Sequence, residues 1–118
     1  MDLKLGLQYS AGSKEMYREF LQMYCDGQEK KKAQIEECYK KEDWDTYTTL
    51  VHALKSTSLS VGGKKVSELA AELEKAGKSL RTGEETVESL TFIRAHQKEA
   101  MELYDETVAE AYRFLKEE

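Results

Sequence analysis

The 118-residue chain contains no proline, only two cysteines and no long apolar run. The absence of proline removes the strongest helix breaker from the whole sequence. Cys25 and Cys38 are too few and too far apart for a disulfide framework or a close metal pair, so we assign them no chemistry. A bilayer-spanning helix needs about 20 apolar residues, and a signal peptide needs an uninterrupted apolar core. We therefore expect a cytoplasmic protein with no direct membrane insertion.

The chain also lacks an excess of basic residues. It has 18 Lys and Arg against 23 Asp and Glu, for a formal net charge of -5. Nucleic-acid binding proteins gather Lys and Arg on one face to contact phosphates, and no such stripe is present, so no nucleic-acid partner is expected. The length fits a single domain over residues 1–118, whose one core leaves little room for an enzyme cleft. With no second apolar stripe, a monomer is the simplest expectation.

Helix-forming residues dominate the composition, and glycines divide the chain into segments of helix length. We predict an all-α fold, an antiparallel four-helix bundle with an additional short N-terminal helix. Asp43 is the expected N-cap of the central helix, and Gly62-Gly63 its expected end. Thr82 to Glu85 resembles a capping box before the last helix. The five predicted helices cover about residues 14–25, 28–41, 44–61, 64–81 and 84–115.

The helix predicted over residues 44–61 has one apolar face and one polar face. At about 100° per residue, its apolar face gathers six residues toward the core: Tyr47, Leu50, Val51, Leu54, Ser58 and Val61. On the same wheel His52 points about 150° away from the centre of this stripe. Thr48 lies one turn before His52, Ser56 one turn after it and Leu59 two turns after it. We expect His52 to be exposed, with Leu59 as an exposed apolar neighbour.

These residue types suit phosphoryl transfer. An exposed imidazole is partly neutral at pH ~7, so one ring nitrogen offers a lone pair to a phosphorylated aspartate. Phosphoryl transfer needs mainly alignment and charge compensation. Lys55, three residues after His52 on the flank of the helix, can supply positive charge, and the Ser56 hydroxyl can donate a hydrogen bond to the same oxygens. Thr48, Leu59 and Gly62 are the predicted partner contacts.

The segment around His52 resembles the signature of histidine-containing phosphotransfer (HPt) domains of two-component phosphorelays, with His first, Lys three residues later and Gly ten residues later. Asp43-Trp44 and the stretch from Leu69 to Lys78 are also similar to bacterial members. One departure is Ser56, where glycine is most frequent in the family. The segment that carries the resemblance is His52-Ala53-Leu54-Lys55-Ser56-Thr57-Ser58-Leu59-Ser60-Val61-Gly62.

The resemblance implies a phosphocarrier whose exposed His52 accepts a phosphoryl group from a receiver-domain aspartate and passes it to another receiver. The expected partners are response-regulator receiver domains and, in some arrangements, a hybrid sensor kinase. Whether the chain is a stand-alone protein or the C-terminal domain of such a kinase stays open. Gly62-Gly63 lacks the spacing of a phosphate-binding loop, so no ATP-dependent kinase activity is expected. The Mg²⁺ used in transfer should come with the receiver, which leaves no cofactor and no metal site in this chain.

Two alternatives belong to other functional classes. A helical-bundle adaptor would bind receiver-like partners without phosphotransfer, and the intact His-Lys-Gly spacing disfavours it. A small metal- or cofactor-binding bundle would use His52, His96 and the cysteines. No Glu-x-x-His pair on two helices supports that alternative, and His96 has no comparable neighbours.

Overall fold

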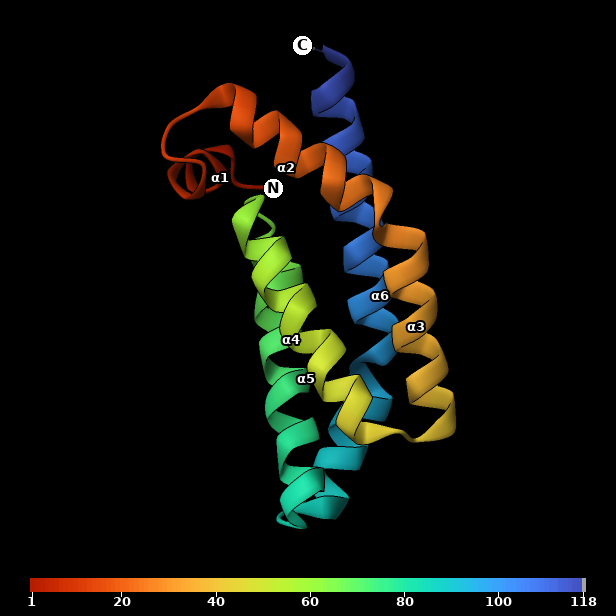
Figure 1. Ribbon diagram of the computed structural model, residues 1–118. Coiled ribbons are helices and arrows are strands. Elements are labelled where there is room, and N and C mark those ends of the chain that lie inside the picture. Colours follow the sequence, from red (N-terminus) through yellow and green to blue (C-terminus); the bar gives the residue numbers. More distant parts are fainter. Residues whose placement is uncertain (118) are drawn as a thin grey trace.

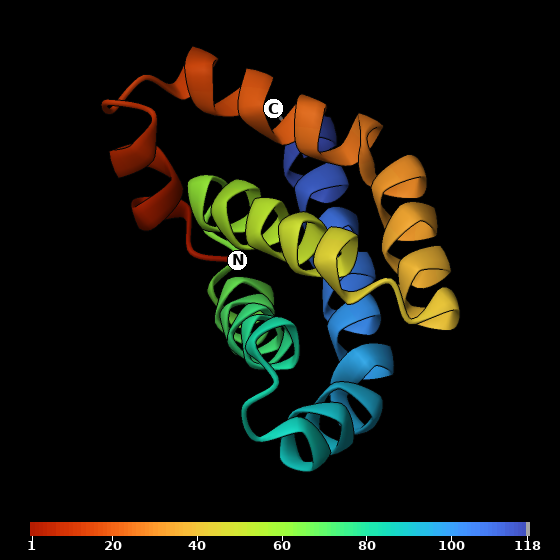
Figure 2. The same ribbon diagram turned by 60° about the horizontal axis from the view of Figure 1, so that its bottom comes forward.

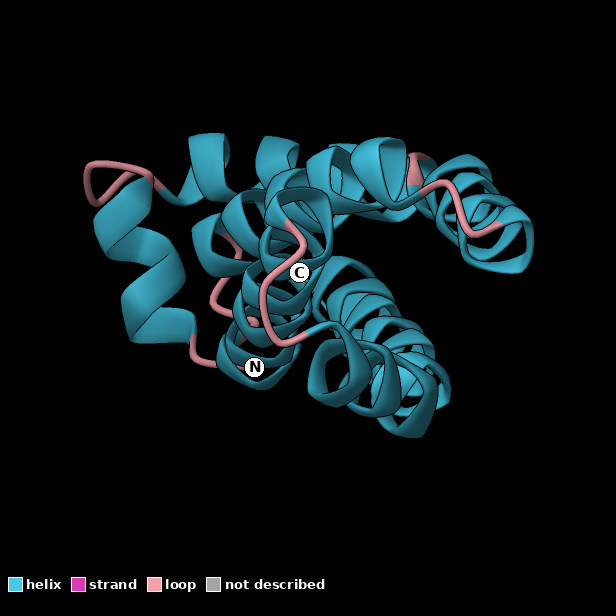
Figure 3. Ribbon diagram, turned by 90° about the horizontal axis from the view of Figure 1, so that it is seen from below, coloured by secondary structure: helices cyan, strands magenta, loops and turns pink. Residues whose placement is uncertain are grey.

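The computed structural model describes residues 1–117, and this part of the chain contains helices without any strand (Figure 3). Four of the helices run up and down beside one another, α3, α4, α5 and α6, which confirms the predicted antiparallel bundle (Figure 1). None of the described helices is both long and apolar enough to span a membrane. The helices in chain order are α1 (Leu3–Tyr9), α2 (Lys14–Asp26), α3 (Gln28–Lys41), α4 (Trp44–Ser60), α5 (Lys64–Thr82) and α6 (Thr86–Glu117).

Local sequence determines where most of these helices begin and end. The Asp43 carboxylate accepts a hydrogen bond from the Thr46 amide at 3.3 Å, which confirms it as the N-cap of α4. After α4, Gly62 adopts a φ of +86°, a left-handed conformation that favours glycine. The predicted capping box at Thr82 is wrong, because Thr82 is the last residue of α5 and its hydroxyl donates to the Ser79 carbonyl. Gly83, with a φ of +78°, then ends that helix.

The helix α1, which was not predicted from the sequence, precedes the expected N-terminal helix. The Asp2 carboxylate caps it by accepting from the Leu5 amide at 3.0 Å. The Asp2 amide donates to the Gly62 carbonyl at 2.7 Å, and the Tyr17 hydroxyl of α2 donates to the Val61 carbonyl at 2.8 Å. Both bonds attach the N-terminal segment to the turn between α4 and α5. In Figures 1 and 2, α1 lies beside the end of α4, while α2 crosses α6.

One core joins all four bundle helices and α2. The predicted inner face of α4 is confirmed, since Tyr47, Val51 and Leu54 are buried there. The Tyr47 hydroxyl donates to Gln97 Oε1 of α6 at 2.7 Å, so the phenol keeps a hydrogen-bond partner inside the core. The opposite face of α4 is thereby left to solvent. Other fully or nearly fully buried apolar residues are Leu21, Ile35, Val66, Leu73, Ile93, Ala100 and Tyr104.

Candidate functional site

His52 lies in the middle of α4 on its exposed face, as predicted, with 57% of its side chain accessible to solvent. The ring is held from one side only. Its Nδ1 lies 2.6 Å from Oε2 of Glu74, a residue of the neighbouring helix α5. Nε2 makes no hydrogen bond to any described residue. The imidazole is therefore anchored through one nitrogen and open at the other.

Glu74, which was not predicted from the sequence, is the residue that organises this site. Its side chain is only 6% exposed, yet its two oxygens receive three partners. Lys55 Nζ donates to Oε1 at 2.7 Å, while Lys78 Nζ lies 3.2 Å from Oε2, the oxygen that His52 contacts. A buried carboxylate needs such partners because an unpaired buried charge is costly.

The partners of Glu74 determine its ionisation. Burial on its own would raise the pKa of Glu74, but hydrogen bonds from Lys55, His52 and Lys78 outweigh that effect and lower the pKa to about 2. Glu74 is therefore a carboxylate at neutral pH, and a carboxylate only accepts hydrogen bonds. It follows that Nδ1 of His52 carries the ring proton in this contact. In the neutral ring, Nε2 then has the free lone pair.

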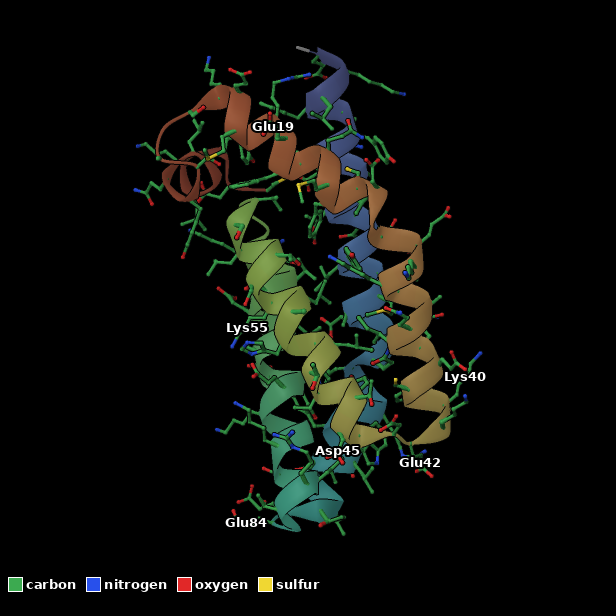
Figure 4. The ribbon with its side chains drawn as sticks, viewed as in Figure 1. Glu19, Lys40, Glu42, Asp45, Lys55 and Glu84 are labelled. Carbon is green, nitrogen blue, oxygen red and sulfur yellow. The ribbon has the colours of Figure 1, made fainter. Side chains whose placement is uncertain are left out.

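Two ammonium groups flank the ring. Lys55 is half-buried, with 32% of its side chain exposed, whereas Lys78 is 59% exposed. Both are tied to the same carboxylate as His52, so both are held close to the ring. Figure 4 shows Lys55 on the side of α4 and α5 that faces away from α3 and α6. The site is thus an exposed imidazole bordered by two cations and backed by one anion.

The other predicted site residues have different outcomes. Ser56 is exposed one turn after His52, and its hydroxyl donates to the His52 carbonyl at 3.3 Å. The expected exposure of Thr48 is wrong, because Thr48 is 3% exposed and faces Gly77 of α5. Leu59 is half-buried instead of exposed, on the helix against which the unexpected α1 packs.

Gly62 is also buried, and its environment explains why a glycine stands there. A Cβ at this position would overlap the backbone carbonyl of Asp2, and its φ of +86° disfavours any side chain. Gly62 therefore closes the α4–α5 turn under the N-terminal segment. Neither Thr48 nor Gly62 offers a side-chain surface to a partner, so the predicted partner contacts at both positions are not retained.

The described residues contain no group of three or more His, Cys, Asp or Glu side chains that could hold a metal ion. His96 lies on α6, where its Nδ1 pairs with Glu99 at 2.8 Å. Nothing in the arrangement around His52 combines carboxylates and imidazoles in the way a metal site requires. Its one carboxylate is already shared among an imidazole and two ammonium groups.

Comparison with protein families agrees with this geometry. A family model described as "Hpt domain" matches residues 19–110, which is most of the chain and includes all of α3, α4 and α5. Comparisons with curated proteins and with solved structures found no match. The match covers His52, Lys55 and Glu74 together. The chain belongs to the Hpt domain family.

Proposed function

We propose that this protein is a phosphorelay phosphocarrier in which Nε2 of His52 accepts and donates the phosphoryl group. Hpt domains in general act in histidine phosphotransfer with receiver domains of response regulators. The observation that carries the proposal for this chain is the 2.6 Å contact between His52 Nδ1 and the ionised Glu74. That contact keeps the proton on Nδ1 and the nucleophilic lone pair on Nε2.

The transfer step follows from this arrangement. The Nε2 lone pair attacks the phosphorus of an aspartyl phosphate on the partner, forming a P–N bond while the P–O bond to the aspartyl oxygen breaks. The electron pair of that bond leaves with the aspartate, which becomes a carboxylate. Nδ1 keeps its proton throughout, and the positive charge that develops on the ring lies beside Glu74. The reverse attack by another receiver's aspartate restores neutral His52.

Lys55 and Lys78 fit the electrostatic demand of this step. Phosphoryl transfer spreads negative charge over three equatorial oxygens, and cations near those oxygens lower the barrier. Lys55 is the more constrained of the two and is the expected main contributor. Ser56 is exposed at the correct turn for a hydrogen bond to the phosphoryl group, provided that its hydroxyl turns away from the His52 carbonyl.

The partner supplies the remaining parts of the reaction. The aspartyl phosphate and the acidic residues that bind Mg²⁺ belong to the receiver domain, so this chain needs no cofactor of its own. It also has no proposed kinase activity toward ATP. Its source of phosphate is a phosphorylated receiver, either on a separate response regulator or within a hybrid sensor kinase.

The test is phosphotransfer from a receiver domain labelled with radioactive phosphate. The purified wild-type chain should acquire a label that is acid-labile and base-stable, as expected for phosphohistidine. His52→Gln should acquire none, while His96→Gln, the matched control at the other histidine, should be labelled like wild type. Label that persists in His52→Gln would overturn the proposal. Binding of the phosphorylated receiver without any transfer would favour the adaptor alternative.

A further inference from the structure

The helices α4 and α5 approach each other closely at a point one turn away from His52. Gly77 of α5 is buried there, and a Cβ added to it would overlap Oγ1 of Thr48 and lie 3.1 Å from Cβ of Thr48. The Thr48 hydroxyl donates to the Trp44 carbonyl at 2.6 Å, which fixes the rotamer that faces Gly77. The two backbones can come this close only because position 77 has no side chain.

This contact and the His52–Glu74 hydrogen bond belong to the same helix pair. Thr48 precedes His52 by four residues, and Gly77 follows Glu74 by three, so the two pairs lie one helical turn apart in an antiparallel arrangement. On the other side of His52, the buried Ser67 of α5 donates to the Lys55 carbonyl at 2.9 Å. Two interhelical contacts therefore bracket the ring and hold α4 against α5.

We propose that Thr48 and Gly77 are positioning residues that set the α4–α5 separation needed for the Glu74–His52 hydrogen bond. The expected effect on the phosphotransfer rate rests on the proposed function, whereas the expected effect on the His52 tautomer does not. The Thr48 hydroxyl bonds the Trp44 carbonyl, and Thr48 contacts no incoming phosphoryl group in this assignment. It acts by defining how far Glu74 lies from Nδ1.

The bond is sensitive to that separation. At 2.6 Å the contact is a short, charge-assisted hydrogen bond. Donor–acceptor distances in N–H···O hydrogen bonds extend to about 3.2 Å. A methyl group at position 77 would overlap the Thr48 side chain, whose rotamer is fixed by its bond to the Trp44 carbonyl, so α5 must move away from α4. Without a firm hold by Glu74, the ring proton distributes between Nδ1 and Nε2, and part of the population loses the Nε2 lone pair.

Three variants test the inference with two readouts. The first readout is the ¹⁵N NMR spectrum of the His52 ring, which distinguishes the two tautomers, and the second is the rate of phosphotransfer from a labelled receiver. Gly77→Ala should weaken or abolish the Nδ1–H signature and slow transfer by about tenfold, since small misplacements at a reacting group are costly. Thr48→Val, which replaces the hydroxyl by a larger methyl group, should shift both readouts in the same direction by a smaller amount.

The double variant Thr48→Ala with Gly77→Ala should recover both readouts, because removing Oγ1 leaves only the 3.1 Å Cβ contact, which a small shift relieves. Gly6→Ala is the matched control for stability: its Cβ would overlap the Tyr17 ring between α1 and α2, away from His52. It should lower the melting temperature and leave the His52 tautomer unchanged.

Wild-type spectra and rates in Gly77→Ala, or no recovery in the double variant, would overturn the inference. If Gly77→Ala does not fold, Thr48→Val decides alone, and an unchanged tautomer in that variant refutes the inference. A wild-type chain that takes up no phosphate would refute the proposed function, whereas a tautomer change in Gly77→Ala would still support the positioning role.

Discussion

Replacing Glu74 by Gln should make the free energy of unfolding less dependent on pH under acidic conditions. In the folded chain, the pKa of Glu74 is lowered to about 2 from an ordinary value of 4.5. A carboxyl with a lowered folded-state pKa stabilises the fold fully above its unfolded-state pKa, and this contribution disappears as the pH falls through the folded-state pKa. The stabilisation by Glu74 should therefore be complete above about pH 5 and lost between about pH 4.5 and 2.

The size of the effect follows from the same pKa. The pKa of Glu74 falls from 4.5 to about 2, and each pKa unit corresponds to about 1.4 kcal/mol of free energy. The full shift therefore corresponds to about 3 kcal/mol. Two of the three partners, His52 and Lys78, are more than half exposed, and solvent screens their interaction with Glu74. We therefore expect about 1–2 kcal/mol of pH-dependent stability from this residue.

Urea denaturation followed by circular dichroism at a series of pH values measures this term. The difference in free energy of unfolding between wild type and Glu74→Gln should shrink by about 1–2 kcal/mol as the pH falls from 5 toward 2.5. Glu72→Gln, an exposed neighbour on α5, is the matched control, and its difference from wild type should stay flat. A flat difference for Glu74→Gln, or one that grows in acid, would refute the reasoning.

Lys55, Gly62 and Tyr47 each make a contact whose removal has a measurable effect. Lys55→Ala should slow phosphotransfer by about tenfold or more, while circular dichroism shows intact helicity. Lys78→Ala should slow phosphotransfer less. Equal transfer rates in wild type and in both variants would contradict the charge-compensation role. Gly62→Ala should lower the melting temperature more than Gly12→Ala, because both glycines have a positive φ but only Gly62 also meets the Asp2 carbonyl. Tyr47→Phe removes the hydroxyl that donates to buried Gln97, so the free energy of unfolding measured by chemical denaturation should fall by about 1–3 kcal/mol. A change near zero would show that Gln97 finds another donor.

The sequence predicts α4, its buried face and the exposure of His52 because every signal for these is local. Asp43 caps the helix, the apolar period places Tyr47, Val51 and Leu54 in the core, and His52 falls opposite them. Each of these inferences needs only the geometry of one helix. The end of α4 is equally local, since Gly62 adopts the left-handed conformation expected after a helix.

What the sequence did not reveal depends on contacts between helices. Glu74 acts through the register of α5 against α4, and a helical wheel of either helix alone does not give that register. One signal was available, because Glu74 is a charged residue beside the buried Ala70 and Leu73. Thr48 was misplaced for the same reason: its position one turn before His52 suggests solvent, but the missing side chain of Gly77 lets α5 cover it. The short α1, Leu3–Tyr9 with Gly6 at its centre, has too few residues to show an apolar period.

The sharing of Glu74 by Lys55 and Lys78 has a consequence for side-chain entropy. A free lysine side chain samples many rotamers, and ordering it at the moment of binding costs about 0.5–1.5 kcal/mol. Here the buried carboxylate already restricts both ammonium groups while the protein is at rest. When an anion binds at His52, the side chains of Lys55 and Lys78 have already lost rotamer freedom during folding. The entropy cost of ordering these lysines is therefore met during folding and not during binding. More of the binding free energy is then left for aligning the partner.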